Sequence, residues 1–269
     1  MIEVFERVTE RLRQGRTIAL ASIVDASGST PQGCGARMIV TRDGEIDFTI
    51  GGGGLEAAVI DDAKRAIESG RSIVKEYDFS GSGPGSVGMI CGGRATVVIE
   101  VITPPEKLLI FGAGHVGLAL AETAVGLGFA LAVVDDRPEY LVQARFPDGV
   151  RLQLTTAGYD ENIPEIDENT YAVIATRSHE IDLKALRYML GRSVAYVGMM
   201  GSRKKSAEIL GKLRAEGVAP ETLRDVHAPV GVEIGSKTPK EIAISILAEI
   251  VRFRNARRPR GCEREVTRQ

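Results

Sequence analysis

Aromatic residues and long apolar runs are scarce in this chain of 269 residues. Tryptophan is absent and aromatic residues make up 5% of the sequence, so there are few rings on which the bases of a single-stranded nucleic acid would stack. No apolar run approaches the roughly 20 residues that a helix needs to span a bilayer. The formal net charge of −2 gives no reason to expect nucleic acid or an anionic membrane as a partner.

Cysteine and histidine are also few. The three cysteines, Cys34, Cys91 and Cys262, form no C-x-x-C pair, and the three histidines lack the H-x-x-x-H and H-E-x-x-H spacings of zinc sites. An odd number of thiols fits a reducing compartment. The first residues are charged and amphipathic, without the apolar core of a signal peptide. We therefore expect a cytoplasmic protein without a zinc site.

The stretch at residues 107–117 is typical of a dinucleotide-binding fold. Four apolar residues are followed by Gly112, Gly114 and Gly117 at G-x-G-x-x-G spacing, and a helical pattern then begins. In this motif the first glycine makes the tight turn, the second lets backbone approach a phosphate, and the third lets helix and strand pack closely. The helix N-terminus offers unpaired N–H groups and a partial positive charge to an anion.

A second strand, predicted at 130–134, ends at Asp135, where this fold places the acid that binds a ribose. His115, in the first turn of the preceding helix, either donates a hydrogen bond to the ligand or is simply exposed at the edge of the crevice. The sequence therefore predicts nucleotide-type binding. The alternative is a scaffold of the same fold whose crevice is empty or repurposed, since fold does not imply function.

Strand and helix patterns alternate through the second half of the chain. Strands are predicted at 108–111, 130–134, 150–154, 171–176 and 194–197, and helices at 115–127, 180–191 and 203–216. Such alternation predicts a parallel, doubly wound sheet with right-handed crossovers. Ligands of these sheets bind outside the carboxyl ends of the strands. The polar residues that follow the predicted strands are therefore candidates for ligand contact: Arg177, His179, Ser202 and Arg203. The alternative for Arg177 and Arg203 is a solvated loop charge, and the alternative for His179 is a cap or a surface hydrogen bond.

The first half of the chain predicts a mixed α+β module with a second glycine-rich junction. Four consecutive glycines, Gly51, Gly52, Gly53 and Gly54, separate a predicted strand from a helix. Their backbone N–H groups could cradle a phosphate or another oxyanion. Equally, glycines allow positive φ angles and close packing of strand on helix.

Cys91 lies between apolar residues and the pair Gly92 and Gly93. A thiolate near unpaired backbone N–H groups would have a lowered pKa, which would make it a nucleophile or a ligand of a metal centre. The alternative is a small buried apolar residue.

The pair Pro104-Pro105 marks a domain boundary, because neither proline can join the interior of a sheet. We expect an N-terminal module at 1–103, a Rossmann-like domain at 106–254, and a basic tail at 255–269. The tail is either a contact segment or, as we expect, a frayed solvated end. The predicted fold class is α/β, with a mixed α+β module followed by a doubly wound Rossmann-like parallel sheet.

Several segments together resemble one known family. They are Gly28-Ser29-Thr30-Pro31, residues 35–40, residues 50–56, Cys91-Gly92-Gly93, residues 111–117, Asp135-Asp136-Arg137-Pro138, residues 176–182, residues 198–203, and the stretch from His227 to Pro239. This combination resembles the XdhC/CoxI family from about residue 17 to residue 254. The loop at 32–35 departs from the proline-containing form of the family, so Cys34 is left outside the expected site.

The resemblance implies an accessory protein that binds the molybdenum cofactor, as molybdopterin or a dinucleotide form. Such a protein protects the cofactor from oxidation and supports its sulfuration and insertion into xanthine dehydrogenase or a related molybdenum hydroxylase. It works with a cysteine desulfurase and tends to form homo-oligomers. The cofactor-binding residues expected from motifs and resemblance together are Gly51, Gly52, Gly53, Gly54, Cys91, Gly92, Gly93, Gly112, Gly114, His115, Gly117, Asp135, Arg177, His179, Ser202 and Arg203.

Within this set, we expect the crevice at Gly112, Gly114, Gly117 and Asp135 to hold the phosphate or nucleotide end of the cofactor. The glycines at 51–54 and Cys91 would then lie near the pterin and the metal, with Cys91 as a candidate ligand of molybdenum. No catalytic residue is identified.

Two other functions fit the same motifs. One is an NAD(P)-dependent oxidoreductase that uses the Rossmann-like domain, although the sequence offers no convincing proton-relay residue. The other is a non-catalytic scaffold that binds a nucleotide without affinity for the molybdenum cofactor. We expect a cofactor-binding accessory protein rather than an enzyme.

Overall fold

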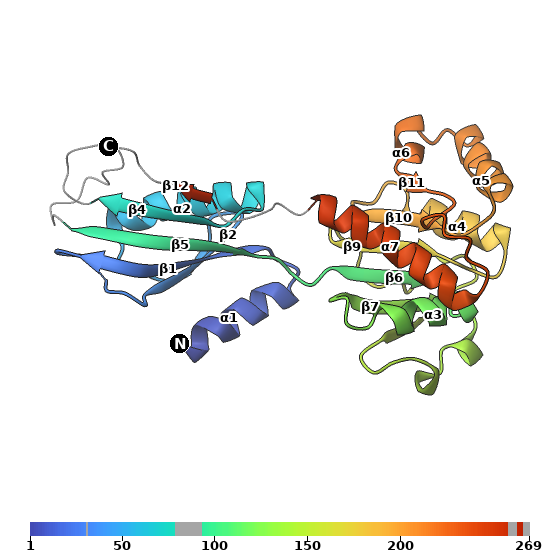
Figure 1. Cartoon of the computed structure of the whole chain (residues 1–269), viewed down its shortest axis with the longest axis horizontal. Coiled ribbons are helices and arrows are strands. Elements are labelled where there is room, and N and C mark those ends of the chain that lie inside the picture. Colours follow the sequence, from blue (N-terminus) through green and yellow to red (C-terminus); the bar gives the residue numbers. More distant parts are fainter. Residues whose placement is uncertain (31, 79–92, 258–262, 266–269) are drawn as a thin grey trace. The chain divides into compact units, whose positions relative to one another are not determined.

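The computed structural model describes residues 1–30, 32–78, 93–257 and 263–265. It divides into two compact units (Figure 1). Unit 1 comprises Met1–Pro104 together with Arg257–Gln269, and unit 2 comprises Pro105–Ala256.

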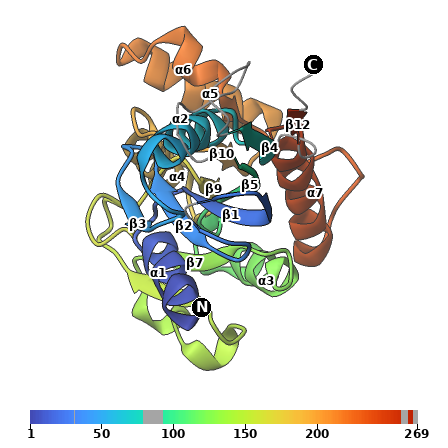
Figure 2. The ribbon, with the colours of Figure 1, turned by 90° about the vertical axis from the view of Figure 1, so that its left-hand side faces the viewer.

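Unit 1 is a six-stranded sheet with a helix on each face. Its strands are β1 (Ile18–Ser27), β2 (Arg37–Thr41), β3 (Ile46–Phe48), β4 (Ile73–Asp78), β5 (Arg94–Ile102) and β12 (Glu263–Glu265), in the order β12-β4-β5-β1-β2-β3. All neighbours pair antiparallel except β12 and β4. Figure 2 shows α2 (Gly53–Ser69) and α1 (Ile2–Arg13) on opposite sides of these strands.

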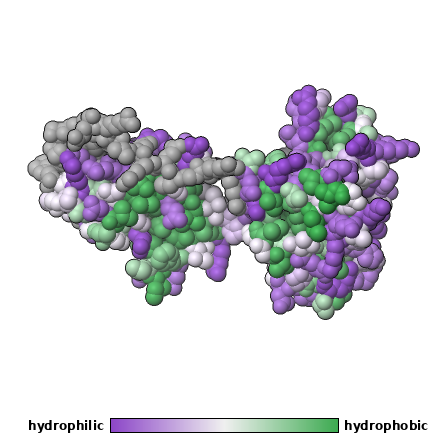
Figure 3. Space-filling view, viewed as in Figure 1, coloured by the Kyte–Doolittle hydropathy of each residue, from purple (hydrophilic) through white to green (hydrophobic). Residues whose placement is uncertain are grey.

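The alternation of side chains along β1 explains the two faces. Ala19, Ala21 and Ile23 are buried in the cluster that contains α2. Ile18 and Leu20 are buried instead in the cluster that contains α1. Successive side chains of a strand point to opposite faces, so the continuous apolar run of β1 supplies both cores. Apolar residues reach the surface of unit 1 in the view of Figure 3. At the start of α1, Met1 and Ile2 are 81% and 75% exposed.

Where the structure describes residues after 254, they form regular structure, whereas a frayed end was expected. Helix α7 (Pro239–Arg257) continues to Arg257, and the three residues of β12 pair parallel with β4, from Glu263 opposite Ile73 to Glu265 opposite Lys75. An edge strand such as β4 presents unpaired backbone groups that a short segment of almost any composition can satisfy. The pairing of β12 with β4 therefore could not be predicted from the side-chain pattern of the sequence.

Unit 2 is a parallel sheet of six strands. They are β6 (Lys107–Phe111), β7 (Ala130–Asp135), β8 (Arg151–Leu154), β9 (Thr170–Ile174), β10 (Tyr196–Met199) and β11 (Val226–His227), in the order β11-β10-β9-β6-β7-β8. Counted along this unit, the order is 3-2-1-4-5-6, the doubly wound arrangement of dinucleotide-binding domains. The predicted fold class is therefore confirmed.

Helices cover both faces of this sheet. They are α3 (His115–Ala124), α4 (His179–Met189), α5 (Arg203–Ala215), α6 (Pro220–Arg224) and α7, with the short 3-10 turns η1 (Pro138–Tyr140) and η2 (Gln143–Arg145) after β7. Leu108 and Ile110 pack with α3 and α7, whereas Leu109 and Phe111 pack with α4 and α5. Burial on both faces accounts for the uninterrupted apolar run of β6.

Across the described ranges, no helix combines the length and the apolar character needed to cross a membrane.

Candidate functional site

A cavity of about 260 Å³ lies in unit 2 at the carboxyl ends of the central strands. It is lined by Gly114, His115, Val116, Arg137, Tyr140, Ala175, Thr176, Arg177 and Met200. These residues follow β6, β7, β9 and β10. Since β6 is flanked by β7 and β9, the cavity lies where the strand order reverses, which is the usual ligand position in such sheets. We call this cavity the crevice.

The three motif glycines differ in what surrounds them. A Cβ added to Gly112, whose φ is +114°, would overlap the carbonyl oxygen of Ala175. A Cβ on Gly117 would overlap the carbonyl oxygen of Gly112. Around Gly114, by contrast, no heavy atom lies within 4 Å of an added Cβ. The first and third glycines are therefore needed for the turn and the packing, and the second borders open space at the crevice.

Helix α3 begins directly at this open space. Gly114 is its N-cap residue, and no side chain caps the helix within the described part of the chain. His115, the first helical residue, is exposed and lines the crevice. The first amides of a helix have no partner within the helix and favour an anion. The N-terminus of α3 is thus suited to binding a phosphate group.

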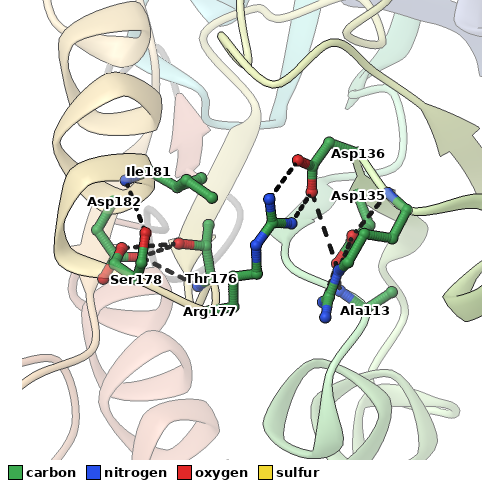
Figure 4. A network of polar contacts seen from close by, with 9 residues as sticks. Ala113, Asp135, Asp136, Thr176, Arg177, Ser178, Ile181 and Asp182 are labelled. Carbon is green, nitrogen blue, oxygen red and sulfur yellow. Dashed lines mark hydrogen bonds and ion pairs between the residues drawn. The ribbon is translucent and has the colours of Figure 1, made fainter.

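Asp135, the predicted ribose ligand, is fully buried and heavily hydrogen-bonded (Figure 4). Its Oδ2 accepts hydrogen bonds from the amide of Ala113 (2.7 Å) and from Arg137 Nη2 (3.0 Å). Its Oδ1 accepts from the amide (3.0 Å) and Nε (2.9 Å) of Arg137. Burial opposes ionisation of Asp135, but the hydrogen bonds from Arg137 and Ala113 outweigh it and lower the pKa. Asp135 therefore joins the glycine turn to Arg137 as a carboxylate.

Arg137 and Tyr140 are crevice residues that the sequence analysis did not include. The guanidinium carbon of Arg137 lies 3.8 Å from the centroid of the Tyr140 ring. With Asp135 in the guanidinium plane and Tyr140 on one face, Arg137 is held at the crevice wall. The segment Asp135-Asp136-Arg137-Pro138 carried part of the family resemblance, and its arginine was the available signal.

Asp136 and Arg177 form an ion pair between the ends of β7 and β9 (Figure 4). Arg177 Nη2 donates to Asp136 Oδ2 at 2.8 Å, and Nη1 donates to Oδ1. The Asp136 side chain is only 6% exposed, whereas that of Arg177 is 41% exposed. Because β6 lies between β7 and β9, this pair spans the carboxyl end of β6.

The turn that carries Arg177 is fixed by Asp182, which is fully buried in α4. Asp182 Oδ1 accepts hydrogen bonds from the amide (3.0 Å) and hydroxyl (2.6 Å) of Thr176. Its Oδ2 forms an ion pair with Lys205, whose ammonium also donates to the carbonyl of Met200 at 3.1 Å. The two crevice residues Thr176 and Met200 are thus tied to one buried carboxylate.

Three other predicted residues do not line the crevice. His179 is the exposed first residue of α4. Ser202 caps α5, since its hydroxyl accepts a hydrogen bond from the amide of Lys205 at 3.2 Å. Arg203 is the exposed first residue of α5. The structure therefore brings together Gly114, His115 and Arg177 from the predicted set, and not these three.

The predicted oxyanion cradle at residues 51–54 already contains a carboxylate of the chain. Glu56 Oε1 accepts hydrogen bonds from the amides of Gly52 (2.7 Å) and Ile50 (3.3 Å) and from the hydroxyl of Thr49. The amide of Gly51 donates to the Thr49 hydroxyl at 3.1 Å. Burial opposes ionisation of Glu56, but these hydrogen bonds lower its pKa. The loop binds an anion, and that anion is Glu56.

The glycines of this loop also adopt the positive φ angles that the sequence analysis gave as the alternative explanation for them. Gly51, Gly52 and Gly53 have φ angles of 124°, 77° and 64°, a region that side chains disfavour. Gly54 is the second residue of α2.

The remaining predicted contacts lie in or beside the undescribed ranges. Cys91 and Gly92 lie outside the described residues, so the prediction of a molybdenum ligand at Cys91 stays a prediction. Gly93 is buried, and a Cβ added to it would overlap the carbonyl oxygens of Ser27 and Ser29. In the described ranges, no three histidine, cysteine or acidic side chains gather as a metal site.

Two family models match the chain. The model described as the XdhC and CoxI family matches residues 11–78, and that of the XdhC Rossmann domain matches residues 108–250. These matches confirm the family resemblance that the sequence motifs predicted.

Three curated relatives are similar in sequence. The chain is 37% identical over 255 residues to the uncharacterized protein YqeB of Escherichia coli, covering 94% of this chain and 47% of YqeB. It is 32% identical over 158 residues to a protein of Bacillus subtilis named as a probable xanthine dehydrogenase subunit, covering 58% and 45%. It is 25% identical over 274 residues to the molybdenum cofactor insertion chaperone PaoD of Escherichia coli, covering 91% and 86%. The chain thus spans about half the length of the first two relatives.

A solved structure shares the fold. It is a crystal structure described as a xanthine dehydrogenase from Bacillus halodurans, with a TM-score of 0.52 and 21% identity. The match covers 93% of this chain and 96% of that one.

Replacing the third motif glycine tests the packing of the crevice floor. We expect Gly117→Ala to lower the free energy of unfolding by about 1–3 kcal/mol, because its Cβ would overlap backbone rather than a movable side chain. Gly114→Ala is the matched control and should change it by less than about 1 kcal/mol, since its Cβ enters open space. Urea denaturation measures both, and equal losses would contradict the assignment.

The pH dependence of unfolding tests the role of Glu56. A carboxylate whose folded pKa is lowered stabilises the fold above its unfolded pKa of about 4.3, and this contribution is lost as pH falls through the folded pKa. Glu56→Gln should therefore be destabilised relative to the unsubstituted protein at pH 7, and the gap should shrink below about pH 4. Glu68→Gln, at an exposed position of the same helix, is the control. A gap independent of pH would contradict the interpretation.

Proposed function

Because the chain belongs to the XdhC and CoxI family, we propose that it is an accessory protein of molybdenum hydroxylases. It binds the molybdenum cofactor, protects it from oxidation, and supports its sulfuration and insertion into a xanthine dehydrogenase or related hydroxylase. The names of two relatives, a molybdenum cofactor insertion chaperone and a probable xanthine dehydrogenase subunit, support this proposal. A cysteine desulfurase and a second copy of the chain are the other proposed partners.

The observation that carries the proposal is the open space at Gly114. It lies beside the uncapped start of α3 and is bordered by the guanidinium groups of Arg137 and Arg177. Backbone amides and arginines are the usual receptors of phosphate. A dinucleotide form of the cofactor carries a pyrophosphate and a ribose, so we assign its nucleotide end to the crevice.

We further propose that Asp136, rather than Asp135, receives the ribose hydroxyls. Both oxygens of Asp135 are engaged by Ala113 and Arg137. Asp136 is paired chiefly with Arg177, whose side chain is 41% exposed. A phosphate that binds Arg177 would release the Asp136 carboxylate, which could then accept hydrogen bonds from a ribose.

The glycine loop at residues 51–54 is a less suitable receptor for an oxyanion. Its amides at Ile50 and Gly52 are bonded to Glu56, so an anionic ligand would have to displace a carboxylate. Contact of Cys91 with the metal end remains part of the proposal. The cofactor supplies the redox-active metal centre of the client enzyme, and the residues described above serve to bind and orient it.

Nucleotide binding tests the assignment of the crevice. We expect Arg177→Ala to weaken the binding of cytidine or guanosine diphosphate by about tenfold, because one charge-assisted hydrogen bond to phosphate is lost. The matched control is Arg203→Ala, at an exposed position outside the crevice, which should leave binding unchanged. Isothermal titration measures both, and equal effects would contradict the assignment.

The substitution Asp136→Asn distinguishes the contribution of the ribose to binding from that of the phosphates. This variant should bind nucleoside diphosphates more weakly, because the amide is a poorer partner for the ribose hydroxyls. It should bind inorganic pyrophosphate at least as well, because Arg177 no longer has a competing carboxylate. Weaker binding of both compounds by the folded variant would refute the proposed role of Asp136.

Cofactor content tests the accessory function. Protein from a molybdate-replete host should contain molybdenum and an extractable pterin, whereas Gly114→Leu, which fills the open space, should fold and contain neither. Deletion of the gene should leave a client hydroxylase without sulfurated cofactor. A fully active client would contradict the proposal, and nicotinamide turnover by the purified protein would favour an NAD(P)-dependent oxidoreductase.

A further inference from the structure

A buried tyrosine packs next to the residues that frame the crevice, and the function proposed above does not use it. Tyr159 is 1% exposed and lies in the loop that follows β8. It does not line the crevice. Its ring belongs to the core on the α4 and α5 side of the sheet, where its centroid lies 6.0 Å from that of Phe111, the last residue of β6.

Hydrogen bonds tie this loop to the end of β7. The amide of Thr155 donates to the carbonyl of Asp135 at 3.0 Å. Within the loop, the Thr155 hydroxyl donates to the carbonyl of Glu161 at 2.5 Å, and the amide of Tyr159 donates to the carbonyl of Thr156 at 3.0 Å. The loop is therefore a compact turn that is attached to the strand carrying Asp135.

The backbone of Tyr159 adopts a conformation that is unusual for a bulky residue. Its φ angle is +54°, and an aromatic residue at positive φ is an outlier because its Cβ crowds the neighbouring carbonyl oxygen. Glycine and asparagine adopt this conformation more readily, so the turn itself does not require a tyrosine. Such strain persists where surrounding contacts hold the residue in place, and it is frequent at binding sites.

The polar contact of the Tyr159 side chain is with the backbone of Asp136. The amide of Asp136 donates a hydrogen bond to the phenol oxygen. Burial and the nearby carboxylates of Asp135 and Asp136 raise the pKa of Tyr159, so the phenol stays neutral. A neutral phenol accepts this hydrogen bond without placing a further charge beside the ion pair of Asp136 and Arg177 (Figure 4).

Of the two carboxylates at the end of β7, Asp136 is held less firmly through its side chain. Asp135 accepts four hydrogen bonds from Ala113 and Arg137. Asp136 is paired chiefly with Arg177, whose side chain is 41% exposed. The backbone contact with the buried phenol is therefore a firmer support for Asp136 than its ion pair at the surface.

We propose that Tyr159 is a positioning residue of the crevice, which holds the backbone of Asp136 so that its carboxylate faces the ribose of a bound nucleotide. This inference rests on the proposed function, in which Asp136 receives the ribose hydroxyls. When a phosphate engages Arg177, the Asp136 carboxylate loses its ion-pair partner, and the hydrogen bond from its amide to the phenol keeps it in place. Tyr159 touches no ligand and acts through Asp136.

Tyr159→Phe removes the hydroxyl and keeps the ring packed on Phe111. Binding of cytidine diphosphate to the full-length variant should weaken by about three- to tenfold, the loss expected for one hydrogen bond. Binding of inorganic pyrophosphate, which has no ribose, should stay unchanged. Tyr171→Phe is the matched control, because Tyr171 is buried in the same sheet and its hydroxyl donates to Glu106 at 3.2 Å, outside the crevice. Isothermal titration measures all four affinities.

A double-mutant cycle tests whether Tyr159 acts through Asp136. Effects of residues that act as a unit do not add. In the Asp136→Asn background, Tyr159→Phe should therefore weaken the binding of cytidine diphosphate by less than about twofold. The same factor in both backgrounds would mean that Tyr159 acts independently of Asp136, which would overturn the proposal.

Hydrogen exchange measures the contact in the absence of ligand. The amide of Asp136 should exchange about tenfold faster in Tyr159→Phe than in the unsubstituted protein, and Tyr171→Phe should leave its rate unchanged. An unchanged rate in Tyr159→Phe, or equal losses of cytidine diphosphate and pyrophosphate binding, would overturn the proposal. If the unsubstituted protein bound neither compound, the proposed function would fail and the role of Tyr159 with it. Nucleotide binding that Tyr159→Phe left unchanged would refute the role of Tyr159 alone.

Discussion

The buried carboxylate of Asp135 is the contact on which the rest of the crevice depends. It joins the backbone of the glycine turn after β6, through the amide of Ala113, to the guanidinium group at the end of β7. Its burial is tolerable because four hydrogen bonds compensate for the lost hydration. The open space at Gly114 and the wall formed by Arg137 are therefore positioned by one ionised side chain.

Carboxylates that accept hydrogen bonds from backbone amides also hold other turns of the chain. Asp182 fixes the loop of Thr176 and Met200, and Glu56 fills the amide cradle before α2. In each case a carboxylate from the chain itself satisfies backbone or cationic groups that would otherwise be costly to bury. These turns are held by hydrogen bonds within the chain, without the need for a ligand. The N-terminus of α3 differs from these turns. Among the described residues, no side chain caps it, so its first amides remain available to a ligand.

The sequence predicted the fold well because its signals are local. The strand, glycines and helix at 107–117 are contiguous, and the alternation of strands and helices implies the parallel sheet. It predicted the crevice only in part. Arg137 and Tyr140 were missed because their contact depends on a turn that no periodicity encodes. The pairing of Glu56 with the glycine loop was missed because a carboxylate in the first turn of a helix is ordinary. Ser202 follows the right strand but caps α5, and His179 and Arg203 are the first residues of their helices and do not line the crevice.

Because Arg177 is already paired with Asp136, a phosphate that bound Arg177 would replace a carboxylate and would not neutralise an unpaired cation. Under the proposed function, a phosphate of the ligand would take the place of the Asp136 carboxylate, so the number of ion pairs at Arg177 would be the same before and after binding. Dissolved salt screens the carboxylate and the phosphate alike. Affinity at this position would thus vary little with ionic strength, and a stray monovalent anion would gain little by entering. Selectivity among anionic ligands would then depend on whether the ligand also carries hydroxyl groups that donate hydrogen bonds to the released Asp136 carboxylate.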